Sequence, residues 1–208
     1  LGYAYRGAEV RFLRTLPPVQ DGAGYSTIED TVYTLVVERG HVTPPLGGQI
    51  DVAGSVLKVP DLRLKPTPAI IDLRTKSSVT AALSLLDEPP FEFLRKAGRP
   101  VDFAEGRAEL ATRLELDLVK NLPLDKVAYA IEGSLLDVRS DRIVPGRVLA
   151  ADRLSVRGDK AGLTISGKGT LSDVPFDAAW RQDFGPEGKG RSRVDGQVTL
   201  SETFNTAF

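Results

Sequence analysis

The sequence contains no cysteine and no methionine, and it has only one histidine and one tryptophan. Without cysteine the chain can form no disulfide bond, no zinc–thiolate site and no thiol nucleophile. This absence suits an oxidising compartment such as the bacterial periplasm, although many cytosolic proteins share it. The single histidine leaves the serines with almost no base to activate them, and no Gly-x-Ser-x-Gly motif is present.

Long apolar runs are also missing. The sequence has no stretch of 18 apolar residues that could span a bilayer, and no recognisable signal peptide. The chain begins at Leu1 rather than at methionine, so we interpret it as a piece of a longer protein or as a processed product. Any membrane anchor is therefore expected outside this segment.

The third absence is an excess of charge of one sign. The 27 lysine and arginine residues nearly balance the 28 aspartate and glutamate residues, which gives a net charge of −1. Nucleic acid binding depends on a basic surface that neutralises phosphates, so no nucleic acid partner is predicted. The 208 residues are 41% hydrophobic and 26% charged, which is typical of a folded globular protein with one large or two small domains.

Few side chains are candidates for chemistry. His41 has no second ligand nearby in the sequence, so we interpret it as an ordinary loop or strand residue rather than a base or a metal ligand. The segment Gly185–Gly190 resembles a phosphate-binding loop, but it lacks the full motif and does not lead from a strand into a helix. We therefore predict no enzyme activity, no cofactor and no metal.

What the sequence has in abundance is alternation with a period of two. Between Ala104 and Leu118 the even positions are small or apolar apart from Thr112, and the odd positions apart from Ala111 are charged. Successive side chains of a strand point to opposite faces, so this segment is predicted to be a strand with one apolar and one charged face. At about 3.3 Å per residue it would span about 50 Å, which favours a wide sheet over a compact sandwich.

Shorter alternating runs recur in both halves of the chain, with glycine and proline between them. The short spacing favours antiparallel hairpins over parallel βαβ units. The predicted fold is mainly β: a long, curved, antiparallel amphipathic sheet that forms an open groove, with a short helical insert. Residues 1–208 are predicted to be one segment of a larger elongated β-groove protein, with a first β-section at 1–76, the helical insert at 77–100 and a second β-section at 101–208.

The predicted insert carries the signals of a helix. Ser77-Ser78 can cap its start, and Leu83 and Leu86 follow at helical spacing. Pro89-Pro90 should interrupt it, because proline clashes with the preceding helical turn. We expect helix within residues 79–97, with Leu83 and Leu86 facing the sheet.

The apolar face admits two uses. It could be the sealed core of a β-sandwich that serves as a binding module or a structural spacer, or it could be an open groove for acyl chains. Long strands and few large aromatics favour the groove, whereas Trp180 taken alone is better explained as a core aromatic. The residues predicted to line the groove are Ile50, Val52, Leu110, Leu114, Leu116, Leu118, Val127, Tyr129, Ile131, Leu163, Ile165, Phe176 and Trp180.

Residues 10–24 contain a strand, a Leu-Pro-Pro turn and a Gly-x-Gly strand, and residues 133–138 and 162–171 are similar to parts of the same unit. Residues 81–98 form the expected helical insert with two prolines in it, and residues 174–181 contain a proline and a tryptophan in one strand. These segments resemble the AsmA-like envelope proteins, and in particular their YhdP branch, with Val174 in place of the usual small residue before the proline.

The resemblance implies a location and a partner. AsmA-like proteins are anchored in the inner membrane of Gram-negative bacteria and cross the periplasm as a long curved β-structure with a hydrophobic groove. They are thought to conduct phospholipid towards the outer membrane. A chain similar to them would be a periplasmic segment that contacts phospholipid acyl chains, with its inner-membrane anchor elsewhere in the protein.

Overall fold

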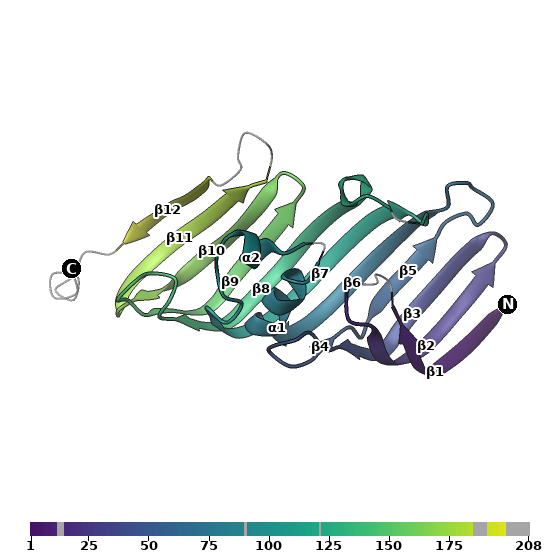
Figure 1. Ribbon diagram of the computed structural model, residues 1–208, viewed down its shortest axis with the longest axis horizontal. Helices are drawn as coiled ribbons and strands as arrows, with labels where there is room; N and C mark the ends of the chain where they lie inside the picture. Colours follow the sequence, from purple (N-terminus) through teal and green to yellow (C-terminus); the bar gives the residue numbers. More distant parts are fainter. Residues whose placement is uncertain (12–14, 90, 121, 185–190, 199–208) are drawn as a thin grey trace.

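The computed structural model describes residues 1–11, 15–89, 91–120, 122–184 and 191–198. Twelve strands form one antiparallel sheet that makes up most of the molecule (Figure 1). The strands are β1 (Gly2–Val10), β2 (Val19–Glu29), β3 (Val32–Val42), β4 (Ile50–Asp51), β5 (Ser55–Val59), β6 (Pro68–Ser78), β7 (Glu105–Asp117), β8 (Ala128–Ser140), β9 (Leu149–Asp159), β10 (Gly162–Leu171), β11 (Val174–Asp183) and β12 (Ser192–Val198).

The strands follow one another across the sheet in chain order, with β4 and β5 both lying between β3 and β6. Every pair is antiparallel, as expected for apolar runs joined by short connections. The segment with the strongest alternation forms β7, which confirms that it is a strand and not a helix. The mainly β, antiparallel fold predicted from the sequence is confirmed.

Cross-strand pairing places the apolar residues on one face, because residues directly opposite each other point to the same side of a sheet. Two rows of such partners run across the strands. The first joins Leu35, Leu57, Ile71, Leu114 and Tyr129. The second joins Leu110, Gly133, Val156, Ile165, Trp180 and Val194.

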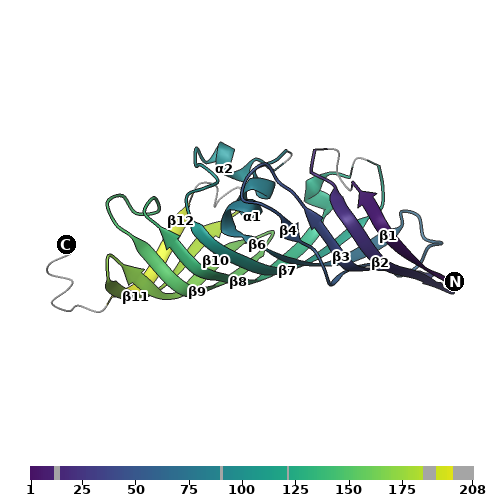
Figure 2. The same ribbon diagram turned by 90° about the horizontal axis from the view of Figure 1, so that it is seen from below.

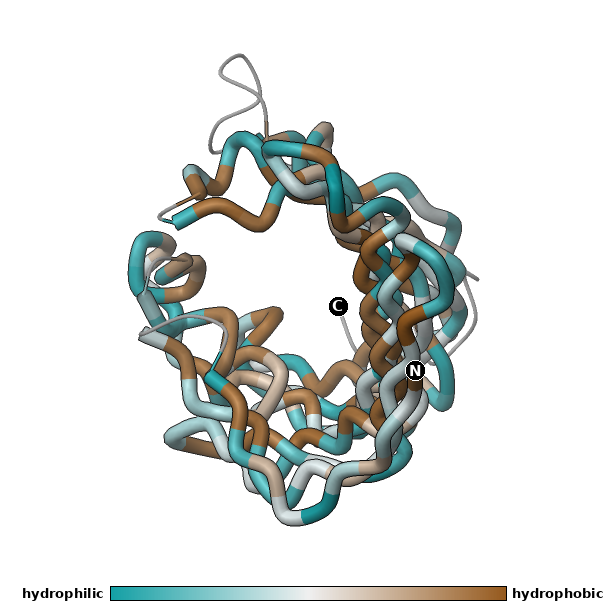
Figure 3. Tube along the Cα trace, turned by 90° about the vertical axis from the view of Figure 1, so that its right-hand side faces the viewer, coloured by the Kyte–Doolittle hydropathy of each residue, from teal (hydrophilic) through white to brown (hydrophobic). Residues whose placement is uncertain are grey.

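Irregularities in neighbouring strands bend the sheet. The pairing of β1 with β2 and of β2 with β3 shifts register near Gly7 and Asp21, and that of β7 with β8 shifts near Gly106 and Asp137; all four residues have positive φ. A bulge bends its strand and increases the local twist. Seen along the long axis, the trace is curved, and the hydrophobic residues lie mostly on its inner side (Figure 3).

The helical insert is the connection between β6 and β7, which pair with each other along the whole of β6. It contains α1 (Val79–Leu86) and α2 (Phe93–Lys96), and a 3₁₀ turn, η1 (Leu124–Lys126), precedes β8. The Ser78 hydroxyl accepts a hydrogen bond from the Ala81 backbone N–H at 3.0 Å, as an N-cap should. Helix is therefore present where predicted, and both helices lie on one side of the sheet (Figure 2).

The orientation of α1 differs from the prediction. Leu86 is 39% exposed and Leu83 is half-buried, whereas the buried side of α1 consists of Val79, Ala81 and Ser84. The helix begins directly at the end of β6, which fixes its rotation, and small residues let the neighbouring loop approach closely. The Leu46 backbone N–H donates to the Ser84 hydroxyl at 3.1 Å, so a larger apolar side chain could not take that place.

A buried apolar cluster lies between α1 and the sheet. Elsewhere the apolar face is not covered by a second layer of strands in the part of the chain that the structure describes. No helix among the described residues is long and apolar enough to cross a membrane. The packed cluster consists of Val42, Ile50, Val52 and Ala81, with Val19, Val37, Leu73 and Leu85 against it.

Candidate functional site

The candidate site is the apolar face of the sheet outside the cluster beneath α1. Most of its large side chains from β6 to β11 are half-buried, because they are shielded by their neighbours on the sheet but not by an opposing layer of strands, whereas Val156 and several smaller side chains are buried. A closed core would bury most of them fully. The half-buried residues of this face include Ile71, Leu110, Leu114, Leu116, Tyr129, Ile131, Leu163, Ile165, Phe176 and Trp180.

Most of the predicted groove residues come together on this face. Leu110, Leu114 and Leu116 lie on β7, and their cross-strand partners continue the face onto β6 and β8. Ile165 stands opposite Trp180 on the adjacent strand. The other residues that the structure places with them are Tyr129 and Ile131 on β8, Leu163 on β10 and Phe176 on β11.

Glycines on this face keep it smooth where large side chains approach. Gly169 stands opposite Phe176, and a Cβ at Gly169 would come within 2.7 Å of the ring. At Gly133, a Cβ would overlap the backbone of β7 beside Leu110. The apolar surface is therefore made of aliphatic and aromatic side chains that lie over glycine positions.

Four predicted residues lie elsewhere. Ile50, at 2% exposure, and Val52 are buried in the cluster beneath α1, so they form core and do not line an open surface. The helix covers them because the loop before β4 packs on α1, a contact that no local pattern reveals. Leu118 follows the end of β7 and is exposed, and Val127 ends η1 just before β8.

Sequence reasoning missed several members of the face. Ile71 on β6 alternates with Asp72 and Arg74 along the strand together with Leu73, which packs against the cluster beneath α1, so the period-two signal was present. Val194 on β12 is 69% exposed and stands opposite Trp180. Leu35 and Leu57 were hidden in short runs where several apolar residues follow one another.

The opposite face of the sheet is charged and exposed to solvent. Arg113 contacts Asp72 at 3.1 Å and Glu115 at 3.0 Å, and Arg107 contacts Asp137 at 2.7 Å. The hydrogen bond with Glu115 is the main reason why the pKa of Arg113 is raised. Exposed pairs of this kind contribute little to stability.

A broad depression of about 860 Å³ crosses β6 to β11. Most of its lining side chains belong to the charged face, since they alternate with Leu73, Ile131 and Leu163 along their strands. Acidic and basic groups both line it, so it has no strong preference for a charged ligand. The charged lining residues are Asp72, Arg74, Arg113, Glu132, Arg157, Asp159, Arg181 and Asp183.

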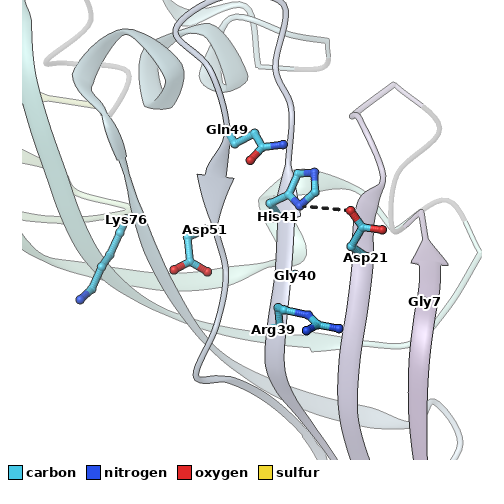
Figure 4. A pocket seen from close by; sticks show the side chains of 8 residues that line it. All are labelled: Gly7, Asp21, Arg39, Gly40, His41, Gln49, Asp51 and Lys76. Carbon is cyan, nitrogen blue, oxygen red and sulfur yellow. Dashed lines mark ion pairs between the residues drawn. The ribbon is translucent and has the colours of Figure 1, made fainter.

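His41 lies in a second pocket, of about 660 Å³, which also lies on polar residues (Figure 4). Its Nδ1 is 3.9 Å from Asp21 Oδ2, and the Asp21 side chain is largely exposed. Arg39, Asp51 and Lys76 also line the pocket. An acid–base pair requires an imidazole that is held in a fixed orientation, and a carboxylate as well hydrated as that of Asp21 does not hold it so.

The same pocket offers no metal site that can be recognised. Across the described ranges, no group of three or more His, Asp or Glu side chains is arranged to hold a metal ion. The segment 185–190, whose sequence resembles a phosphate-binding loop, lies outside the described residues. The candidate site is therefore the apolar face.

Comparisons with models of known protein families, with curated proteins and with solved structures found no match for this chain. The apolar face can hold apolar ligands by dispersion and desolvation, and it carries a few hydroxyl groups that can bind a polar atom.

Proposed function

We propose that this chain is a segment of an elongated, AsmA-like β-groove protein that binds the acyl chains of phospholipid and conducts the lipid between the inner and outer membranes of a Gram-negative bacterium. The observation that carries the proposal is the pair of mostly apolar rows, one from β3 to β8 and the other from β7 to β12, that together cross the sheet. In this proposal the protein is not an enzyme, works in the periplasm and is held by an inner-membrane anchor outside this segment.

The geometry of the rows suits a hydrocarbon chain. Neighbouring strands lie about 4.8 Å apart, so the seven strands from β6 to β12 provide about 30 Å of apolar wall. Removing apolar surface from water contributes about 25 cal/mol per Å², which favours an acyl chain lying along such a wall. The rows offer an acyl chain mostly apolar side chains from one strand to the next, so a chain could move along them without breaking strong polar contacts.

A closed β-sandwich or a sealed spacer is the competing function. It would need a second layer over Leu114, Ile131 and Ile165, and the described residues form a single sheet. Among the described residues the buried apolar cluster lies beneath α1, and it covers only a part of the face that this alternative would have to seal.

Extraction of the purified chain with organic solvent, followed by mass spectrometry, tests the proposal. We expect a molar amount of phospholipid comparable with that of the protein. A wash with a higher detergent concentration should lower this amount. A photoreactive residue at Leu114 should form lipid adducts, whereas the same residue at Glu109, on the charged side of β7, should not. Equal adducts at both positions, or none at Leu114, would contradict the proposal.

A further inference from the structure

Three hydroxyl groups gather at the N-terminal end of the apolar face. Tyr3 on β1 stands directly opposite Ser26 on β2. Ser26 in turn stands opposite Leu35, and Tyr33 is two residues before Leu35 on the same strand. Diagonal neighbours on one face are within reach of aromatic side chains, so both tyrosines border Ser26.

Ser26 is fully buried, and its Oγ has no hydrogen-bond partner in the part of the chain that the structure describes. Nearby hydroxyl groups still affect one another: Ser26 and then Tyr33 lower the pKa of Tyr3, and burial raises the pKa of Tyr33. A buried hydroxyl without a partner is costly, so Ser26 Oγ is an unsatisfied polar group that a tyrosine hydroxyl or a bound polar atom would stabilise.

The two tyrosines differ from their neighbour Tyr5. The Tyr5 hydroxyl already donates to the Val36 carbonyl oxygen at 2.9 Å. Among the described residues no such acceptor is present for Tyr3, which is 56% exposed. The Tyr3 hydroxyl is therefore able to donate its proton to a bound molecule.

We infer that Tyr3, Ser26 and Tyr33 form a hydrogen-bonding site for the ester carbonyl of a glycerophospholipid whose acyl chain lies along the adjoining apolar row. The inference rests on the proposed function, and it identifies the chemical group of the lipid that this site binds. The row that starts at Tyr3 and Ser26 continues through aliphatic side chains, so a carbonyl at the tyrosines places its acyl chain on them. These side chains are Leu35, Leu57, Ile71 and Leu114.

The chemistry of the site favours an ester over a phosphate. Neutral hydroxyl donors surrounded by Ile28, Leu35 and Val59 suit a neutral acceptor in an apolar setting. A phosphate would need arginine or lysine, which the alternation places on the opposite face of these strands. An ester carbonyl is also the polar group nearest to the acyl chain.

The test compares a diacyl phosphatidylethanolamine with its diether analogue, which has the same chains and headgroup but no ester carbonyl. Binding of each to the purified chain is measured by competition with a fluorescent acyl probe. The unchanged protein should prefer the diacyl lipid by about 2-fold to about 10-fold, the range of one neutral hydrogen bond. Tyr3→Phe/Tyr33→Phe should bind both lipids equally and keep its affinity for the diether lipid.

Tyr25→Phe is the matched control, because Tyr25 adjoins Ser26 on β2 but points to the opposite face and is exposed. If the double variant fails to fold, Tyr3→Phe alone, at an exposed position, should still reduce the preference. No preference in the unchanged protein, or a preference that survives both tyrosine changes, overturns the inference and leaves the proposed function intact. If neither lipid binds at all, the proposed function fails as well.

Discussion

Gly47 lies directly against the backbone of Ala81, so closely that a Cβ at Gly47 would overlap the first turn of α1. Ser78 at the start of the helix donates a hydrogen bond to the Gly47 carbonyl oxygen at 2.7 Å. These contacts attach the helical insert to the loop before β4 and hold α1 over the cluster that contains Ile50 and Val52.

Gly47→Ala should therefore destabilise the protein more than Gly48→Ala. Both glycines have positive φ, so alanine is strained at either position by about 1–2 kcal/mol. Only Gly47 would also overlap Ala81, because nothing lies near Gly48, and overpacking adds about 1–3 kcal/mol. Urea unfolding measures both variants; equal losses of stability would show that the loop does not rest on the helix.

Leu114→Asp should block lipid without unfolding the sheet. A carboxylate on this face meets hydrocarbon when lipid is present, which costs about 2 kcal/mol or more, but it can hydrate when the face is empty. We expect at least tenfold less cross-linking of lipid at Ile131, with the free energy of unfolding changed by less than about 1–2 kcal/mol.

The matched control is Ala130→Asp, on the charged side of β8 next to Ile131, which should leave cross-linking unchanged. A sealed core gives the reverse result, since Leu114→Asp would then bury an unpaired charge and unfold the domain. A folded variant that still cross-links lipid as well as the parent protein would rule out the groove at this position.

Trp180 is the only tryptophan, and it reports on the same face. It is half-buried between Ile165 and Val194 on the neighbouring strands. Phospholipid brominated on its acyl chains should quench Trp180 fluorescence, whereas the unbrominated lipid should not. If Ile165→Asp abolishes the quenching, the acyl chain lies beside Ile165 and Trp180. If brominated lipid leaves the Trp180 emission of the unchanged protein as it was, the acyl chain does not contact β11.

Asp61 should titrate at an unusually low pH for an aspartate. Hydrogen bonds from the Arg63 side chain, and then from its backbone N–H, hold the pKa of Asp61 at about 2. Because the pKa of Asp61 is lower in the folded state, its contact with Arg63 favours the folded state at pH values above the unfolded pKa of about 4. This contribution to stability is lost as the pH falls towards 2. NMR titration of the carboxyl carbons measures this, and Arg63→Gln should return the Asp61 pKa to its ordinary range.

Local periodicity determined much of the architecture. Alternation along β7, β8 and β10 identified strands and assigned Leu114, Ile131 and Ile165 to an apolar face, because side chains on a strand alternate whatever the strand pairs with. Ser78 and the prolines near residue 89 likewise located the helical insert, since capping and proline effects act within a few residues.

What only the tertiary structure decided depends on contacts between distant residues. Bulges near Asp21 and Asp137 change which side chains face inward, and a register between two strands is not visible in either one alone. Ile50 alternates like a groove residue, yet α1 covers it because Gly47 lets the loop approach the helix. Tyr3 and Tyr33 meet at Ser26 only because β1, β2 and β3 pair in this register, so the sequence supplied the hydroxyl groups and the sheet brought them together.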